Sequence, residues 1–323
     1  MTKFTPLQYI LIAIANHFGL DKVSWQERIK FSENMFARST VRDCLLEAKE
    51  PLLMQKAINA YYDALSGKPT GYIMSLDATA SGLQIMACLT GCKYTAQEVN
   101  LLNTGKRENI YQKVADKMEL PLDVVKKPVM THYYNSKRQP EEAFGTRVNE
   151  FLDIIEELLP GAEDAMVDIQ SCFRNDVLAN KWTLPDGHVA YVKNMVAVDK
   201  RIEVDELDHA TFTHRVYENS TVKFDLSLPA NIVHSIDGYI CREMYRRAYA
   251  QGFELLSIHD SFWASPNYMQ NVRENYRDIL IDISKMNLLK SILREITEEK
   301  DLVYYKHSNN LHTYIQDAEY ALS

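Results

Sequence analysis

Glycine, proline and cysteine are all scarce in this sequence. Its 323 residues include 11 Gly, 10 Pro and 5 Cys, with no internal repeat or low-complexity linker. So few helix breakers argue against a turn-rich chain and favour a compact, mostly helical protein with a small sheet. Only Cys88 and Cys92 lie close together, at a spacing that suits one helix face, so the cysteines indicate neither a disulfide framework nor a zinc site. A reducing cytoplasm is the default environment.

A long apolar run is also missing. The apolar residues of MTKFTPLQYILIAIA form a short, broken stretch that ends at Asn16 and His17, with Asp21 and Lys22 close behind. A membrane span needs roughly 20 apolar residues, and a secretory signal ends in a cleavage site. We therefore expect a buried helix here and no association with a membrane.

The sequence has no excess of positive charge. Its net charge is -8, whereas nucleic-acid binding relies on Lys and Arg side chains that contact phosphates. Taken alone, this charge favours a protein that does not bind nucleic acid. An acidic total can nevertheless hide a basic groove, for which Lys126, Lys127, Lys137 and Arg138 are candidates. The total therefore decides little, because carboxylates that hold metal ions also contribute to it.

The spacing of apolar residues predicts an α+β fold that is mostly helical. Hydrophobic residues make up 46% of the chain, enough for one large core or two fused ones. Strands are expected over 71–76 and on both sides of His259–Asp260, and a hairpin over 182–193 turns at Pro185–Asp186–Gly187. Helices are expected over 6–18, 24–36 and 39–66, from near Ser81, over roughly 95–180, over 229–251 and in the tail from 266 to 323.

Two aspartates stand at strand ends. Asp77 follows the apolar strand and precedes a helix, and Asp260 lies at the tip of a strand-turn-strand unit. Phosphoryl transfer to a 3′-hydroxyl uses two divalent ions about 4 Å apart, and carboxylates on adjacent strand ends suit that task. Mg²⁺ keeps water and substrate oxygens beside one or two carboxylates, so two protein ligands suffice. The plain alternative is that each Asp caps a helix or turn.

A lysine and a tyrosine recur at helical spacing in the basic segment. Lys126, Met130 and Tyr134 would share one helix face, and the separation of 8 residues between Lys126 and Tyr134 corresponds to roughly 12 Å. A lysine there can bind triphosphate oxygens while the tyrosine stacks on the base or senses the ribose. A solvated basic face with core tyrosines is the alternative. Pro128 predicts that this helix begins near Lys126 or is kinked there.

Three segments, in order, resemble motifs A, B and C of the single-subunit RNA polymerases of phages and mitochondria. They are LDATASGLQ at 76–84, KKPVMTHYYNSK at 126–137 and SIHDSF at 257–262. The resemblance implies that Asp77 and Asp260 hold two Mg²⁺ ions, that Lys126 contacts the triphosphate, and that Tyr134 helps to select ribonucleotides. It places His259 beside the second metal ligand.

Lesser matches extend the resemblance over nearly the whole chain. The segments 19–31, 99–117, 182–187, 229–238 and 317–323 are similar to family segments. They bring Lys22 close to substrate phosphates, Tyr111 into the first fingers helix and His234 to the nucleic acid, and they end in an aromatic foot near the active centre. Each has a plain alternative: a surface lysine, a core tyrosine or a structural histidine.

The resemblance also implies a site and a layout. The catalytic residues would be Asp77, Asp260, Lys126, Tyr134 and His259; the substrate-binding residues Lys22, Lys127, Tyr111, Ser81, Gly82, Gln84 and Asn135; and the nucleic-acid contacts His234, Lys137 and Arg138. The fold would be a right-hand palm with a small antiparallel sheet and helical fingers. We expect a helical palm insertion or subunit-contact region at 1–68, palm at 69–94, fingers at 95–228, and palm with the C-terminal foot at 229–323.

The family's N-terminal domain, thumb and Asp-x-x-Gly-Arg segment have no counterpart in this sequence. Either the sequence is a fragment or a second polypeptide supplies these parts, and a start at Met1 just after the place of that segment favours the second polypeptide. That arrangement is similar to the heterodimeric RNA polymerase that schitoviruses use in the cytoplasm of an infected bacterium. Leu122 replaces a triphosphate-binding arginine, which shifts that contact to Lys127 or Lys22. Asn135 replaces a glycine after the motif B tyrosine.

The expected function is template-dependent synthesis of RNA from nucleoside triphosphates on DNA. One alternative is a DNA polymerase of the related A family, whose motif A carries a bulky Glu where this chain has Ala80, Ser81 and Gly82. These small residues favour a site that admits the 2′-hydroxyl. The other alternative is a catalytically inactive helical protein that binds partners, and a magnesium titration with nucleotide separates the two classes.

Overall fold

The structure, a computed structural model, describes residues 1–134, 136–221 and 227–323. Asn135, which the motif resemblance assigns to substrate binding, lies outside the described residues. Helices predominate and three small antiparallel sheets accompany them, so the expected α+β class is confirmed. No helix among the described residues is both long and apolar enough to cross a membrane.

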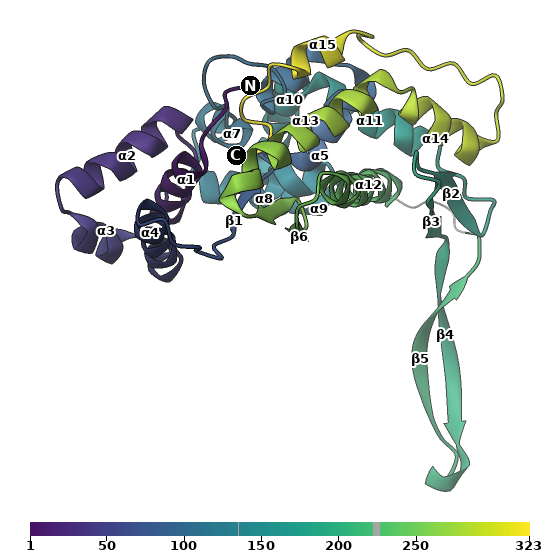
Figure 1. The fold of residues 1–323 in the computed structure, drawn as a ribbon. Coiled ribbons are helices and arrows are strands. Elements are labelled where there is room, and N and C mark those ends of the chain that lie inside the picture. The colour runs from purple at the N-terminus through teal and green to yellow at the C-terminus, as the bar shows by residue number, and fades with distance from the viewer. Residues whose placement is uncertain (135, 222–226) are drawn as a thin grey trace.

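The N-terminal helices form a group at one side of the molecule (Figure 1). Capping boxes begin the first two: Thr5 with Gln8, and Ser24 with Glu27. The expectation of a single helix over 39–66 is wrong. The helix is interrupted before Pro51, because the residue before a proline avoids helical angles. The helices are α1 (Pro6–Phe18), α2 (Trp25–Ala37), α3 (Val41–Glu47) and α4 (Pro51–Leu65).

A three-stranded antiparallel sheet brings distant segments together. Its strands are β1 (Met74–Asp77), β7 (Ser261–Ala264) and β6 (Leu256–Ile258), in that order. Met74 and Leu76 are buried while Asp77 is exposed, so β1 presents its last side chain outside the core. The strand begins three residues later than expected, whereas the helix expected near Ser81 is confirmed as α5 (Ser81–Thr90).

Helix α5 forms the centre of the core. Its residues from Leu83 to Thr90 are all buried, and it packs against three long helices. The three long helices are α11 (Pro160–Ser171), α12 (Leu228–Ala250) and α13 (Met269–Lys285).

The tail was expected to be helical from 266 to 323. After α13 it contains α14 (Leu288–Thr297) and α15 (Leu311–Ile315), but residues 298–310 are not helical, because Glu298 ends α14 in the left-handed conformation.

The segment between α5 and α11 is helical, as expected. The helix carrying Lys126 begins at Leu122 rather than near Lys126, and it contains Pro128 in its interior. It ends at His132, so Tyr134 lies beyond it and the expected helical face shared by Lys126 and Tyr134 is not formed. The helices are α6 (Lys93–Glu98), α7 (Ile110–Met118), α8 (Leu122–His132), α9 (Arg138–Phe144) and α10 (Val148–Leu158).

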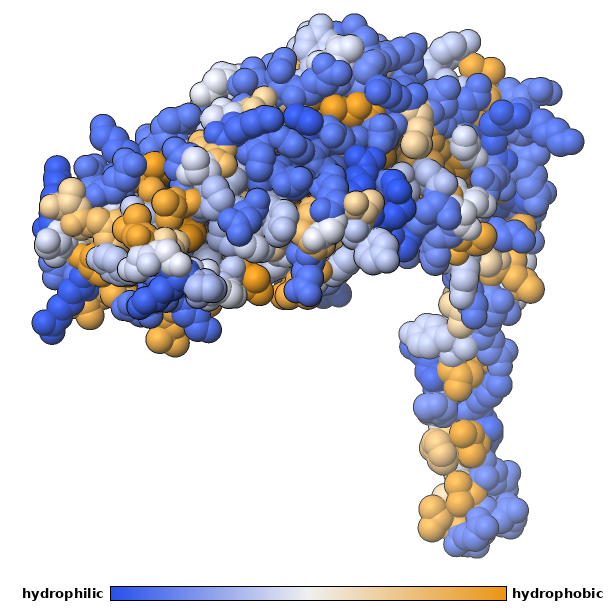
Figure 2. Space-filling model, in the orientation of Figure 1, coloured by the Kyte–Doolittle hydropathy of each residue, from blue (hydrophilic) through white to orange (hydrophobic). Residues whose placement is uncertain are grey.

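Two hairpins follow α11. The expected first hairpin is confirmed as β2 (Ala179–Thr183) and β3 (Val189–Lys193), and the indole of Trp182 donates to the hydroxyl of Ser235, 3.0 Å away, on α12. The second hairpin, β4 (Met195–Val204) with β5 (Ala210–Asn219), was not predicted; it projects from the body as a long arm (Figure 1). Apolar side chains such as Ile202 and Phe212 stand exposed along it (Figure 2).

Candidate active site

A cleft of about 710 Å³ opens at the end of the three-stranded sheet. Its walls come from α1, β1, the start of α5, α8, α12 and the turn between β6 and β7. Most of the site residues expected from the sequence line it: Lys22, Asp77, Ser81, Gly82, Tyr111, Lys126, Tyr134, His234, His259 and Asp260.

The two expected metal ligands lie at neighbouring positions of the sheet. Asp77 pairs with Ser261 across β1 and β7, and the next N–H, of Ala78, donates to the carbonyl of Asp260 at 3.0 Å. Asp260 follows His259 in a two-residue turn, where His259 adopts a φ of 55° in the left-handed region. The Cys241 thiol donates to the His259 carbonyl at 3.3 Å, which ties this turn to α12. Segments 183 residues apart in the sequence thus meet at one sheet edge.

A third carboxylate, from Asp237 on α12, lines the same cleft. Burial, and then the negative charge of Asp260, raises the pKa of Asp237 to about 6. The pKa of Asp260 is raised for the same reasons, by burial first and also by Asp77. The Ser81 hydroxyl is hydrogen-bonded with both Asp237 and Asp260. Sequence reasoning missed Asp237, although it follows His234 by three residues on one helix.

The carboxylates fit a divalent cation. Among the described ion pairs, none joins Asp77, Asp237 or Asp260 to a cationic side chain. Like charges gathered in a half-buried cleft repel each other, and their oxygens are the ligands that Mg²⁺ prefers. These side chains could therefore hold magnesium.

Aromatic side chains flank the cleft on the α8 side. The ammonium of Lys126 lies 6.0 Å from the ring centre of Tyr111, and the ring centres of Tyr134 and His234 are 4.8 Å apart. Burial raises the pKa of Tyr134, and the charges of Asp237 and Asp260 raise it further. The residue Tyr134 is 39% exposed, so it remains open to a ligand.

Gln84 does not line the cleft. Its side chain is fully buried, and its amide nitrogen donates to the carbonyls of Val99 and Ala321, each at 3.0 Å. Its amide oxygen accepts from the Tyr276 hydroxyl at 2.7 Å. With these partners, Gln84 supports the wall of the site from behind, and its direct binding of substrate stays a prediction.

Three expected basic contacts lie outside the cleft lining. Lys127, Lys137 and Arg138 are exposed, and Arg138 pairs with Glu142 at 2.6 Å. Their binding of substrate or nucleic acid stays a prediction. Leu122, where the resemblance expects a cation, does line the cleft.

The C-terminal residues pack beside Asp77, where the resemblance places the foot. The N–H of Ser323 donates to the Asp77 carbonyl at 2.9 Å, and Leu322 forms a β-bridge with Ala78. The ring of Tyr320 stacks on Trp25 with centres 5.4 Å apart. The end of the chain thus forms part of the site, and the indole and phenol rings anchor it to α2.

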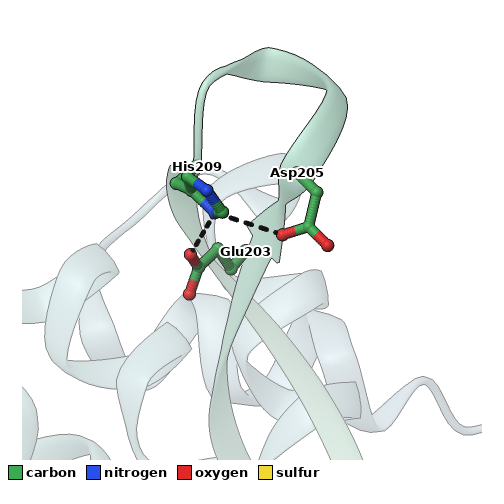
Figure 3. Close-up of side chains that lie close together, drawn as sticks. All are labelled: Glu203, Asp205 and His209. Carbon is green, nitrogen blue, oxygen red and sulfur yellow. Dashed lines mark ion pairs between the residues drawn. The ribbon is translucent and has the colours of Figure 1, made fainter.

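A separate group of possible metal ligands lies at the tip of the β4–β5 arm (Figure 3). His209 Nδ1 is 2.9 Å from a carboxylate oxygen of Glu203 and 3.3 Å from one of Asp205. All three residues are exposed, and among the described residues they are the only His, Cys or acidic group of three with ligand atoms within 4.8 Å of one another. They pair with each other, so we assign no metal site to them.

The cleft therefore defines a class of site, one that gathers unpaired carboxylates on a sheet edge beside a lysine and a tyrosine, as metal-dependent phosphoryl transfer requires. The chain belongs to the DNA-dependent RNA polymerase family, whose model matches residues 4–123 and 181–321. The segment with Lys126 and Tyr134 lies between the matched ranges.

Relatives of this family cover most of the chain. A mitochondrial DNA-directed RNA polymerase 1B of Nicotiana tabacum is 21% identical over 362 residues, which span 90% of this chain and 36% of the relative. The mitochondrial DNA-directed RNA polymerase of Mus musculus is 22% identical over 89% of this chain and 29% of its own length. That of Neurospora crassa is 32% identical over 122 residues, or 34% of this chain and 9% of the relative. The chain thus spans about a third of the first relatives' length.

Proposed function

We propose that this chain is the catalytic subunit of a DNA-directed RNA polymerase and adds ribonucleotides to an RNA 3′-end with two Mg²⁺ ions. One observation carries the proposal. Asp77 and Asp260 occupy neighbouring positions on one sheet edge, and both line a cleft with Lys126 and Tyr134. Membership of the RNA polymerase family supports RNA over DNA as the product.

The carboxylates of Asp77 and Asp260 would hold the metal ions. When bound, such ions lower the pKa of the attacking 3′-hydroxyl and neutralise the triphosphate and the leaving pyrophosphate. The Ser81 hydroxyl, bonded to Asp260, fixes the direction of that carboxylate. Asp237 adds negative charge behind the pair and strengthens the attraction for cations.

The remaining side chains of the cleft bind and orient the nucleotide. Lys126 places its ammonium at the phosphates, and the half-exposed Tyr134 contacts the sugar and base. His259, held in the turn beside Asp260, orients the primer end, and His234 contacts nucleic acid. The small residues Ser81 and Gly82 leave room for the 2′-hydroxyl.

The layout and partners complete the proposal. The three-stranded sheet would be the palm, and α6 to α11 with the hairpins the fingers. DNA template, RNA product and nucleoside triphosphates are the proposed ligands. By the resemblance to the heterodimeric schitovirus enzyme, we propose that a second polypeptide supplies a thumb and an N-terminal domain. The cytoplasm of an infected bacterium is the proposed location, by the resemblance to schitovirus polymerases.

Replacement of the metal ligands tests the proposal. Asp77→Asn or Asp260→Asn, assembled with the polypeptide that co-purifies with the native protein, should bind a primed DNA scaffold normally. RNA extension should fall by about a thousandfold or more, because each lost charge weakens the hold on a metal ion. Asp205→Asn at the arm tip is the matched control and should extend normally. Extension at the native rate by the Asp77 or Asp260 variant contradicts the metal assignment.

A further inference from the structure

The cleft contains cationic side chains that have no ion pair with a neighbouring carboxylate among the described residues. Arg107, Lys22 and Lys126 all line the cleft. Among the described residues, no carboxylate oxygen lies within 4.0 Å of a side-chain nitrogen of these three. Lys22 and Lys126 are exposed, so water solvates them, but Arg107 is half-buried. A guanidinium withdrawn from water without an anion is costly unless a ligand supplies one.

Arg107 stands directly beside the catalytic strand end. Its Nε donates to the Ser323 hydroxyl at 2.9 Å, and the Ser323 N–H donates to the Asp77 carbonyl at 2.9 Å. A single residue therefore separates the Arg107 side chain from the backbone of Asp77. The neighbouring Glu108 is already paired with Lys113, at 2.8 Å, and does not neutralise Arg107.

A second guanidinium lies near Arg107. Arg28 is fully buried and donates to the carbonyls of Val23 and Asp21, at 3.0 and 2.7 Å. Burial, and then repulsion by Arg107, lowers the pKa of Arg28 to about 9. Burial also lowers the pKa of Arg107, although the charge of Asp21 partly opposes that shift. The charge of one carboxylate, Asp21, thus acts on two guanidinium groups.

We propose that Arg107 binds the triphosphate of the incoming nucleotide, beside Lys22 and Lys126. The inference rests on the proposed polymerase function and names a residue that the sequence motifs did not mark. A guanidinium presents paired N–H donors that match two phosphate oxygens, and Nη1 and Nη2 remain available while Nε holds Ser323. Leu122, in the same cleft, supplies no charge, so Arg107 provides the guanidinium of this site.

Binding of inorganic tripolyphosphate to the whole chain tests this assignment without catalysis. Isothermal titration with and without magnesium compares the wild type with Arg107→Gln, Arg107→Lys, Ser323→Ala and Lys106→Gln. Loss of a charged hydrogen-bonding group should weaken binding by about tenfold or more in Arg107→Gln, and less in Arg107→Lys. Ser323→Ala removes the partner of Arg107 but keeps its charge, and Lys106 is an exposed neighbour outside the cleft lining. Lys106→Gln should bind as the wild type does, and Ser323→Ala should weaken binding by less than Arg107→Gln.

Three results would overturn the assignment. The first is wild-type binding of tripolyphosphate by Arg107→Gln. The second is an equal defect in Ser323→Ala, which shows that Arg107 only braces the chain end. The third is a defect confined to a single-stranded oligonucleotide titrated in parallel, which assigns Arg107 to backbone phosphates instead. Thermal melting of each variant checks folding, and Arg107→Lys keeps the test valid if Arg107→Gln unfolds.

Catalytic assays separate this inference from the proposed function. With the co-purified polypeptide, Arg107→Lys should raise the KM for nucleoside triphosphates more than it lowers kcat. If the wild type binds tripolyphosphate through Arg107 yet extends no primer, the anion site stands and the polymerase function falls. If primer extension is robust and the Arg107 variants share the wild-type KM and tripolyphosphate affinity, the polymerase function stands and the assignment of Arg107 to the triphosphate falls.

Discussion

The cleft and the β4–β5 arm differ in whether their charged side chains form ion pairs. In the arm, Arg215 holds Asp199 through two hydrogen bonds of 2.7 and 3.0 Å, and Lys200 pairs with Glu218 across the strands. In the cleft, Asp77 and Asp260 lie side by side with no cationic partner among the described ion pairs. The arm can therefore form its ion pairs within one hairpin, whereas the cleft leaves these carboxylates available to a ligand.

The two regions also differ in how they are held. The arm is a two-stranded ribbon whose pairing partners lie within 25 residues of sequence. The cleft wall depends on contacts between distant segments, such as Gln84 with Ala321 at a separation of 237 residues. Changes to the cleft wall should therefore affect the whole fold, and changes to the arm should stay local.

The largest expected effect comes from the support behind the cleft. Gln84→Ala removes the buried donors to Val99 and Ala321 and the acceptor for Tyr276. Each buried group left without a partner costs about 1–3 kcal/mol, so we expect a loss of about 4 kcal/mol in the free energy of unfolding. Urea denaturation measures it. The control is Gln55→Ala, an exposed amide bonded to Asn59, which should change stability by no more than about 0.5 kcal/mol. An equal loss of unfolding free energy in the two variants would contradict the expected role of Gln84 as a support of the cleft wall.

A smaller, pH-dependent effect is expected from Asp237. Its pKa is raised to about 6 by burial and by Asp260, so the folded protein holds a proton that the unfolded chain releases near pH 4. Stability should therefore fall as pH rises from 4 through 6, and Asp237→Asn should be more stable than the wild type at pH 7.5 but not at pH 4. Thermal melting of the wild type and Asp237→Asn across this pH range checks the direction of the stability change.

Asp199 in the arm supplies the opposite case. Arg215 lowers the pKa of Asp199, so its contribution to stability is present at neutral pH and is lost as pH falls through the lowered pKa. Asp199→Asn should therefore destabilise slightly at pH 7.5. A stabilising Asp199→Asn, or an Asp237→Asn that destabilises at neutral pH, contradicts the comparison.

The smallest effect is expected from removing the arm itself. Replacement of residues 198–216 by an Asn-Gly turn keeps Met195 and Asn219, whose side chain donates to Leu178 and Asn194 of the body. The melting temperature of the body should shift by less than about 2 °C, because the exposed ribbon contributes little burial. A larger loss would show that the arm packs on the body.

Local signals in the sequence predicted much of the fold. The helices over 6–18 and 24–36, the β1–α5 junction and the turn at Pro185–Asp186–Gly187 each depend on nearby residues, and the structure confirms these elements. The β4–β5 arm was missed because MVAVDKRIEV has four apolar residues followed by three charged ones, and so lacks the strict alternation that marks a half-exposed strand.

The site was predictable only in part. Motif spacing identified Asp77 and Asp260, because strand ends can be read from the sequence. The roles of Asp237 and Arg107 depend on tertiary packing, since a single charged residue in a helix or loop resembles any surface charge. Burial of Gln84 likewise follows from the approach of α13 and the chain end, which no local pattern records.

The docking of the final residues has a practical consequence for handling this protein. Ser323 is buried and bonded to the Asp77 backbone, and Glu319 accepts a hydrogen bond from the N–H of Thr2 at 2.5 Å. An affinity tag fused after Ser323 would emerge at the cleft wall and displace the bridge at Leu322. Labels and immobilisation handles are better inserted at the outer turn of the arm, where they leave the catalytic strand undisturbed.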